Sequence, residues 1–228
     1  MRKIFLLFGS EGNLGKVVKK VILSKNFEHV FLFDSKFKKP VQSYGNVTKI
    51  KIDNLTVEKN VEEAFNNIQK KTRGEYHLFS TIGIFNAGKG IENLTVKEWQ
   101  TALDVNLTVP FLLGKHFLKF IKQIKSKGSI CFTGALSSLA YENNKSNYII
   151  SKNALNTFVN LLALEGKEFG VSANVIAPYI IDTKENRKWV ENKSDLISPK
   201  RIGDFVYLLT ENYSFISGNI IKMPWTLD

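Results

Sequence analysis

Short apolar runs alternate with amphipathic helical stripes, and this alternation constrains the fold more than any other feature of the sequence. Residues 4–8, IFLLF, form a continuous apolar run, which is typical of a strand buried on both faces. The next segment has apolar residues at helical spacing, which predicts a helix with one apolar stripe. These residues are Leu14, Val17, Val18, Val21 and Ile22. Strands separated by helices predict a parallel sheet covered by helices on both sides.

The alternation continues through most of the chain, without a linker or an internal repeat. Further strands are expected within residues 29–34, 47–53, 77–88, 128–134, 171–178 and 218–223. Further helices are expected around residues 57–68, 104–125, 147–169 and 204–212. The sequence therefore predicts the α/β class and a single doubly wound Rossmann domain over residues 1–228. Its parallel sheet should have about seven strands, with ligands at their carboxyl ends.

The composition excludes several kinds of function. The net charge is +11, but the lysines are spread along the chain without a localised basic stripe, so no nucleic-acid partner is expected. The single cysteine excludes an internal disulfide framework, and the histidines form no ligand-like cluster, so no metal site is expected. No apolar stretch reaches membrane-spanning length. The first apolar run is too short for a signal peptide, and we expect a cytoplasmic protein without a membrane partner.

A glycine-rich loop follows the first predicted strand. The segment FGSEGNLG places Gly9, Gly12 and Gly15 between that strand and the first predicted helix. Glycine allows backbone N–H groups to approach a pyrophosphate, and the helix N-terminus favours an anion there. The loop therefore predicts a nucleotide site. A tight strand-to-helix turn without a ligand is the alternative.

Asp34 ends the second predicted strand. A carboxylate at this position binds ribose hydroxyls and repels a 2′-phosphate, so it favours NAD(H) over NADP(H). The alternative is an ordinary turn residue at a strand end. Lys36 and Lys38 lie close by in the sequence, and their charges would help to accommodate a phosphate.

Tyr148 and Lys152 lie one helical turn apart in a predicted helix, so their side chains share one face. Tyrosine has a pKa of about 10 and is a poor acid at neutral pH. A neighbouring ammonium group is expected to lower that pKa. The pair is then suited to exchange a proton with a carbonyl that accepts hydride. A surface pair without chemistry is the alternative for this spacing alone.

Several motifs in the same order resemble the short-chain dehydrogenase/reductase family along nearly the whole chain. The glycine loop resembles T-G-x-x-x-G-x-G, with Phe8 in place of the threonine and Asn13 in place of the middle glycine. FNAG at residues 85–88 resembles N-N-A-G, and YIISK resembles Y-x-A-S-K. APYIIDT resembles P-G-x-x-x-T, with Tyr179 in place of the glycine.

This resemblance implies an NAD(P)-dependent oxidoreductase that transfers hydride to a carbonyl or quinonoid small molecule. It implies that Tyr148 is the acid or base, that Lys152 binds the nicotinamide ribose, and that Asn106 supports a proton relay. The implied cofactor-binding residues are Gly9, Ser10, Gly12, Asn13, Leu14, Gly15, Asp34, Asp53, Asn54, Asn86, Ala87, Gly88, Tyr148, Lys152, Pro178 and Thr183. The family's two long helices form its dimer interface, so a homodimer or homotetramer is expected.

One residue departs from the family pattern. Ala135 lies where the family usually has a serine that helps to hold the substrate oxygen. The quinoid dihydropteridine reductases, one branch of the family, also have alanine there, and their glycine loop resembles GSEGNLG. A dihydropteridine-like substrate is therefore included in the expectation.

The hydroxyl of Thr133, Ser137 or Ser138 is close enough in the sequence to replace the absent serine, and the sequence leaves this choice open. A second hypothesis belongs to another class of function. It is a non-catalytic nucleotide-binding sensor or structural protein that has kept the same fold.

Overall fold

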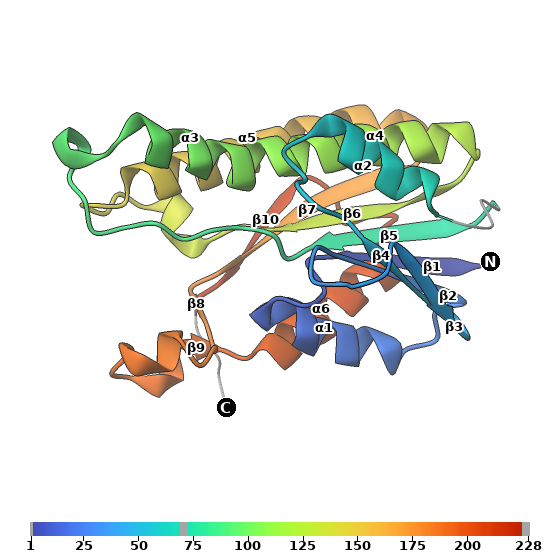
Figure 1. Ribbon diagram of the computed structural model, residues 1–228, viewed down its shortest axis with the longest axis horizontal. Helices are drawn as coiled ribbons and strands as arrows, with labels where there is room; N and C mark the ends of the chain where they lie inside the picture. Colours follow the sequence, from blue (N-terminus) through green and yellow to red (C-terminus); the bar gives the residue numbers. More distant parts are fainter. Residues whose placement is uncertain (1, 69–72, 225–228) are drawn as a thin grey trace.

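The computed structural model describes residues 2–68 and 73–224 and shows a central sheet between layers of helices (Figure 1). The eight strands that the described residues contribute to this sheet follow the order β10-β7-β6-β5-β1-β2-β4-β3. They are β1 (Lys3–Phe8), β2 (His29–Asp34), β3 (Val41–Tyr44), β4 (Val47–Lys51), β5 (Glu75–Ser80), β6 (Lys127–Thr133), β7 (Val171–Pro178) and β10 (Asn219–Met223). All neighbours pair in parallel except β3 and β4. The predicted α/β fold and its parallel sheet are confirmed, and β3 adds an antiparallel edge strand.

The strand order reverses between β1 and β5. From β1 the chain builds outward through β2 and β4, and then it returns to place β5 on the other side of β1. In an open α/β sheet, such a reversal leaves a crevice at the carboxyl ends of the two strands. The segments that follow Phe8 and Ser80 therefore meet at this crevice.

Helices cover both faces of the sheet (Figure 1). One face carries α1 (Asn13–Leu23) and α6 (Pro199–Glu211), which pack against each other. The other face carries α2 (Glu58–Asn66), α4 (Val109–Gln123) and α5 (Ser146–Gly166). Alternate residues of β1 enter two cores, with Ile4, Leu6 and Phe8 in one and Phe5 and Leu7 in the other. This double burial is the reason for the continuous apolar run.

Some elements differ from the predicted ones. The helix expected around residues 104–125 is preceded by α3 (Val96–Leu103), and a π-helical segment, η2 (Asp104–Thr108), joins α3 to α4. The short strands β8 (Ile180–Ile181) and β9 (Leu196–Ile197) form a separate parallel pair. The short 3-10 helices are η1 (Ile91–Asn93), η3 (Leu136–Leu139), η4 (Lys167–Phe169), η5 (Asn186–Lys188) and η6 (Lys193–Asp195). Across residues 2–68 and 73–224, each helix is too short or too polar to cross a membrane.

Candidate functional site

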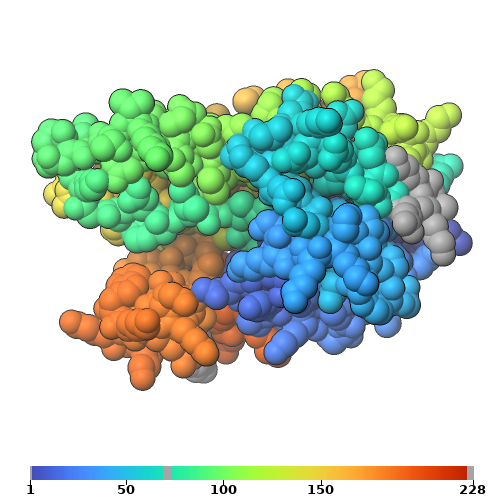
Figure 2. All heavy atoms as spheres, viewed as in Figure 1, coloured from blue at the N-terminus to red at the C-terminus, as the bar shows by residue number. Residues whose placement is uncertain are grey.

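Two adjoining cavities lie at the carboxyl ends of the strands. Their volumes are about 560 and about 440 Å³, and both are lined by Gly12 and by residues 81–84. The first cavity extends toward β2 and β4, and the second extends toward α5 and the segment after β7. Figure 2 shows the surface hollowed between the green segment that contains α3 and the orange segment that follows β7. The cavities lie at the sheet's reversal point, where a ligand was expected.

The glycine loop forms a tight cradle beside both cavities. A Cβ atom on Gly15 would lie 1.9 Å from the Gly9 carbonyl oxygen, so a larger residue would displace the loop. Gly9 has a φ of +80°, which favours glycine. The first turn of α1 starts at Asn13, and its cap, Gly12, offers no side chain to the backbone N–H groups of that turn. These N–H groups are therefore available to an anion.

Ser10 supports the same interpretation. Its side chain is fully buried, and its Oγ has no hydrogen-bond partner within the part of the chain that the structure describes. A buried hydroxyl without a partner is costly unless a ligand or water satisfies it. The cradle at Gly15 and the unpaired hydroxyl both fit the pyrophosphate of a dinucleotide.

The first cavity contains a fixed carboxylate. Asp34 Oδ2 accepts a hydrogen bond from the Glu11 N–H at 2.7 Å, and Oδ1 accepts one from the Lys36 N–H at 3.0 Å. These bonds hold the carboxylate at the edge of the cavity, which Asp53 and Asn54 also line. Such a wall suits the adenosine half of a dinucleotide.

The second cavity brings Tyr148 and Lys152 together with Thr133 and Gly83. Lys152 is buried, and its Nζ donates a hydrogen bond to the Thr133 carbonyl oxygen at 2.8 Å. A Cβ atom on Gly83 would lie 2.9 Å from this Nζ. A glycine at position 83 thus leaves room for the lysine ammonium group beside the turn after β5.

Burial sets the protonation of both side chains. It raises the pKa of Tyr148 to about 12, with a further contribution from the negative charge of Glu142. It also lowers the pKa of Lys152 to about 8. From the sequence, the opposite shift was expected for the tyrosine, because a neighbouring charge lowers its pKa and the loss of solvent cannot be read from the sequence. Tyr148 is therefore a protonated phenol at neutral pH, and burial makes it a weaker acid than a free tyrosine. It still holds the proton that an alkoxide, which is a stronger base, would take.

Asn106 lies in the π-helical segment and is fully buried. Its Oδ1 accepts a hydrogen bond from the Ile84 N–H, and its Nδ2 donates to the Ile84 carbonyl oxygen, both at 3.0 Å. Its Nδ2 also contacts Ser151 Oγ on α5 at 3.1 Å. Asn106 thus fastens the turn after β5 to the helix that carries Tyr148. The residue is outside the described linings of both cavities, and its place in a proton relay remains a prediction.

The structure does not bring Asn86, Ala87 and Gly88 to the described linings of either cavity. Residues 81–84 line both cavities instead, because β5 ends at Ser80 and these residues follow it directly. Thr81 Oγ1 donates to the Gly9 carbonyl oxygen at 2.9 Å and so ties this turn to the glycine loop. The segment FNAG resembles the family motif in its letters, whereas STIG at residues 80–83 lies at the end of β5.

Most of the other predicted cofactor residues are brought together. The linings contain Gly9, Gly12, Asn13, Leu14, Asp34, Asp53, Asn54, Tyr148, Lys152, Pro178 and Thr183. Phe85, Glu142 and Lys145 also line the second cavity, although none of them was predicted as a site residue from the sequence. The Phe85 ring packs edge-on against Tyr148, with 4.8 Å between the ring centroids. No motif could identify these residues, because only the folded chain brings them to the cavity.

The segment after β7 forms one wall of the second cavity. Thr183 and Trp189 belong to its lining. Asn13 Nδ2 donates to Glu185 Oε2 at 2.8 Å, which joins the glycine loop to this segment. The residue that replaces the family's middle glycine thus connects two walls of the site.

Comparisons with known proteins agree with this geometry. A profile of the family described as short chain dehydrogenase matches residues 3–194. The 3-oxoacyl-[acyl-carrier-protein] reductase FabG of Rickettsia felis is 26% identical over 240 residues, covering 97% of this chain and 95% of that protein. FabG of Buchnera aphidicola subsp. Schizaphis graminum is 31% identical over 157 residues, covering 62% and 64%. The solved structure of ElxO with NADP bound has a TM-score of 0.85 at 23% identity, covering 98% of this chain and 97% of that one.

Proposed function

Because the chain belongs to the short-chain dehydrogenase family of NAD(P)-dependent oxidoreductases, we propose that it reduces a carbonyl group of a small molecule with NADH or NADPH. One observation carries this proposal. A half-buried, protonated phenol, Tyr148, lies in the same cavity as the buried lysine Lys152, beside the glycine cradle. This pair can donate a proton to a substrate oxygen while the cradle holds an anionic cofactor.

Each half of the proposed cofactor has its own residues. The N–H groups at the start of α1 would hold the pyrophosphate, and Asp34 would hold the adenosine ribose. Lys152 would bind the nicotinamide ribose, and Thr183 the carboxamide. A bound nicotinamide would supply a hydride to the carbonyl carbon. Tyr148 donates its proton to the oxygen, so that a carbonyl, a reduced cofactor and one proton become an alcohol and an oxidised cofactor.

We propose that NADH is the preferred cofactor. This preference rests on Asp34, whose two backbone hydrogen bonds fix its negative charge where a 2′-phosphate would lie. Lys36 lines the same cavity and partly offsets this charge. The fold-level neighbour ElxO is solved with NADP, so the two cofactors need a direct comparison.

The relatives suggest the first substrate class to test. Several are named as reductases of 3-oxoacyl groups on acyl carrier protein, so we propose a 3-oxoacyl thioester as the leading substrate. A quinonoid dihydropteridine is the second candidate. Ala135 cannot donate a hydrogen bond to the acceptor, and an activated acceptor needs less of this stabilisation than an ordinary ketone does. The cavity also carries the half-exposed aromatic side chains of Phe85, Tyr179 and Trp189, which would pack against an apolar substrate body.

We also propose that the protein forms a homodimer or homotetramer through α4 and α5. These helices expose Phe111, Ile150, Leu161 and Leu164. An exposed apolar surface of this kind is typical of a protein interface. On α4 and α5 it could pack against the same helices of a second copy of the chain.

The proposed function is tested by the oxidation of NADH and NADPH, followed by absorbance with a panel of acceptors. Acetoacetyl-CoA serves as a soluble 3-oxoacyl thioester, beside a quinonoid dihydropterin and phenanthrenequinone. We expect cofactor oxidation that depends on at least one acceptor. The product should be the 3-hydroxyacyl thioester from acetoacetyl-CoA, the tetrahydropterin from the quinonoid dihydropterin, or the reduced quinone from phenanthrenequinone. Binding of the cofactor without turnover on any acceptor would contradict the proposal and favour the non-catalytic nucleotide-binding protein.

A further inference from the structure

A reductase of this design needs more than one hydrogen-bond donor at the substrate oxygen. Negative charge develops on that oxygen as hydride arrives, and donors aimed at it lower the barrier. Tyr148 supplies one donor. Ala135, at the position of the family's serine, is 4% exposed and has only a methyl group. The structure distinguishes among the three neighbouring hydroxyls.

Thr133 and Ser138 already use their protons. Thr133 Oγ1 donates to the Ser80 carbonyl oxygen at 2.9 Å. Ser138 Oγ donates to the Ala135 carbonyl oxygen at 2.6 Å and accepts from Asn156 Nδ2 at 2.9 Å. A hydroxyl has only one proton to donate. Neither group is therefore free to donate to a substrate.

Ser137 differs from both. It lies in the described lining of the second cavity with Tyr148 and Lys152, whereas Ala135 and Ser138 do not. Within residues 2–68 and 73–224, its Oγ has no hydrogen-bond partner, while its carbonyl oxygen accepts from the Ala140 N–H at 3.3 Å. Ser137 thus combines a hydroxyl proton that no described residue accepts with a place in the wall of the cavity where a substrate would bind.

The turn that carries Ser137 is anchored to α5. The short helix η3 starts directly after Ala135. The next residue, Ser138, is tied to α5 because its Oγ contacts Asn156 and its carbonyl oxygen accepts from Asn153 Nδ2 at 3.0 Å. A donor on an anchored turn needs little reorganisation when charge develops. The buried Ser138 therefore positions its neighbour.

We propose that the Ser137 hydroxyl is the second donor to the substrate oxygen and replaces the serine that is absent at Ala135. This inference rests on the proposed carbonyl reduction. It implies that Ser137 acts on the substrate and not on the cofactor. It also implies that an acceptor with an intrinsically electrophilic carbonyl depends less on Ser137 than an ordinary ketone does.

The test compares Ser137→Ala with the matched variant Ser137→Thr, which keeps a hydroxyl. With acetoacetyl-CoA, Ser137→Ala should lower kcat/KM by about 10²-fold, as expected for the loss of one such donor. The loss should be several times smaller with phenanthrenequinone, whose adjacent carbonyls activate each other. The threonine variant should retain most of the wild-type rate. Cofactor affinity and thermal unfolding should stay unchanged in both variants.

Two results would overturn the inference and are distinguishable from failure of the proposed function. If the wild-type protein and the Ser137→Ala variant turned over equally fast, Ser137 would have no role at the substrate oxygen, and the proposed reductase function would still stand. An equal loss in the alanine and threonine variants, together with weaker cofactor binding or lower thermal stability, would show a structural role only. If the wild-type protein reduced no acceptor, the proposed function and this inference would both fall.

Discussion

Replacement of Tyr148 by phenylalanine is expected to lower turnover by about 10² to 10⁴-fold, the usual contribution of a positioned general acid. The substitution removes only the phenol oxygen, so the ring still packs against Phe85. Because burial raises the pKa of Tyr148 to about 12, the wild-type residue stays protonated across the neutral range. The variant therefore loses the proton donor without losing a charge.

The experiment measures kcat with the best acceptor and cofactor affinity by fluorescence in the same preparations. Affinity for the reduced cofactor should match that of the wild-type protein. Tyr141→Phe is the matched control, since this tyrosine is fully exposed and should give wild-type rates. A Tyr148→Phe variant with full turnover would contradict the proposed role of Tyr148 as the proton donor.

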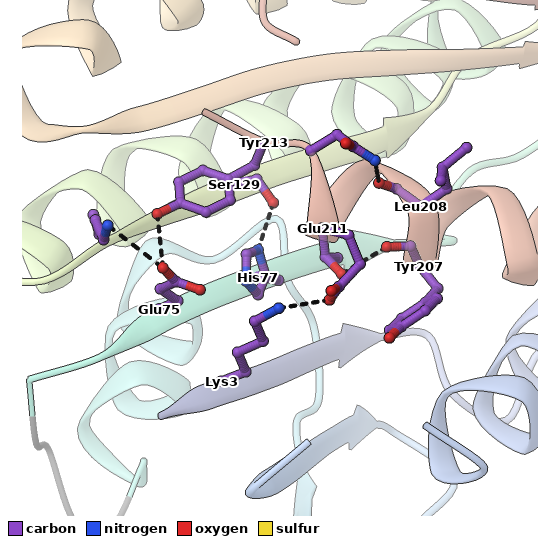
Figure 3. Close-up of polar contacts among 11 residues, drawn as sticks. Lys3, Glu75, His77, Ser129, Tyr207, Leu208, Glu211 and Tyr213 are labelled. Carbon is purple, nitrogen blue, oxygen red and sulfur yellow. Dashed lines mark hydrogen bonds and ion pairs between the residues drawn. The ribbon is translucent and has the colours of Figure 1, made fainter. Parts of the chain in front are cut away.

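Acidification is expected to destabilise the fold through His77. This side chain lies in β5 with no exposed surface, and Figure 3 shows it between the Lys3–Glu211 pair and the Tyr213 ring. Its Nδ1 lies 2.8 Å from Ser129 Oγ, and its Nε2 has no partner among the described residues. Burial lowers the pKa of His77 to about 3, and the charge of Lys3 adds to this effect.

The direction of the pH effect follows from the two states. The unfolded chain binds a proton at His77 below its ordinary pKa of 6.5, whereas the folded chain does so only near 3. Stability is therefore complete above this ordinary pKa and declines below it by about 1.4 kcal/mol per pH unit. From about pH 6.5 to about pH 5, the expected loss is about 2 kcal/mol.

Urea unfolding at several pH values between about 5 and 7 measures this decline. His77→Phe keeps an aromatic ring beside Phe27 and Tyr213 and should remove most of the slope. Ser129→Ala is the matched control, because it removes the hydrogen bond and leaves the imidazole buried. Its free energy of unfolding should be lower at every pH, with the slope retained. Equal slopes in wild-type and His77→Phe proteins would contradict the assignment.

The layered fold was predictable because local pattern and burial agree. Residues 4–8 are apolar at every position, and they enter two cores on opposite faces of the sheet. Short edge elements carry no such signal. The strand β3 is half-exposed or exposed along its length, and β8 and β9 have two residues each, too few for a period to emerge.

Site residues that belong to local sequence motifs could be predicted from the sequence. Properties that depend on burial and on hydrogen bonds between distant segments could not. The glycine loop and the Tyr148–Lys152 pair are local patterns, and the structure brings both to the cavities. The upward pKa shift of Tyr148 could not be predicted from the sequence, because it arises mainly from burial of the side chain. The free hydroxyl of Ser137 became distinct only after the bonds of Thr133 and Ser138 were seen.

Fluorescence titration of the purified protein with NADH and NADPH tests the central claim most directly, with Asp34→Ala measured in parallel. The account predicts that both reduced cofactors bind and that NADH binds more tightly. The substitution should lower the affinity for NADH and raise the affinity for NADPH, because it removes the carboxylate that binds ribose hydroxyls and repels a 2′-phosphate. Failure of the wild-type protein to bind either cofactor would contradict the assignment of the two cavities to a dinucleotide.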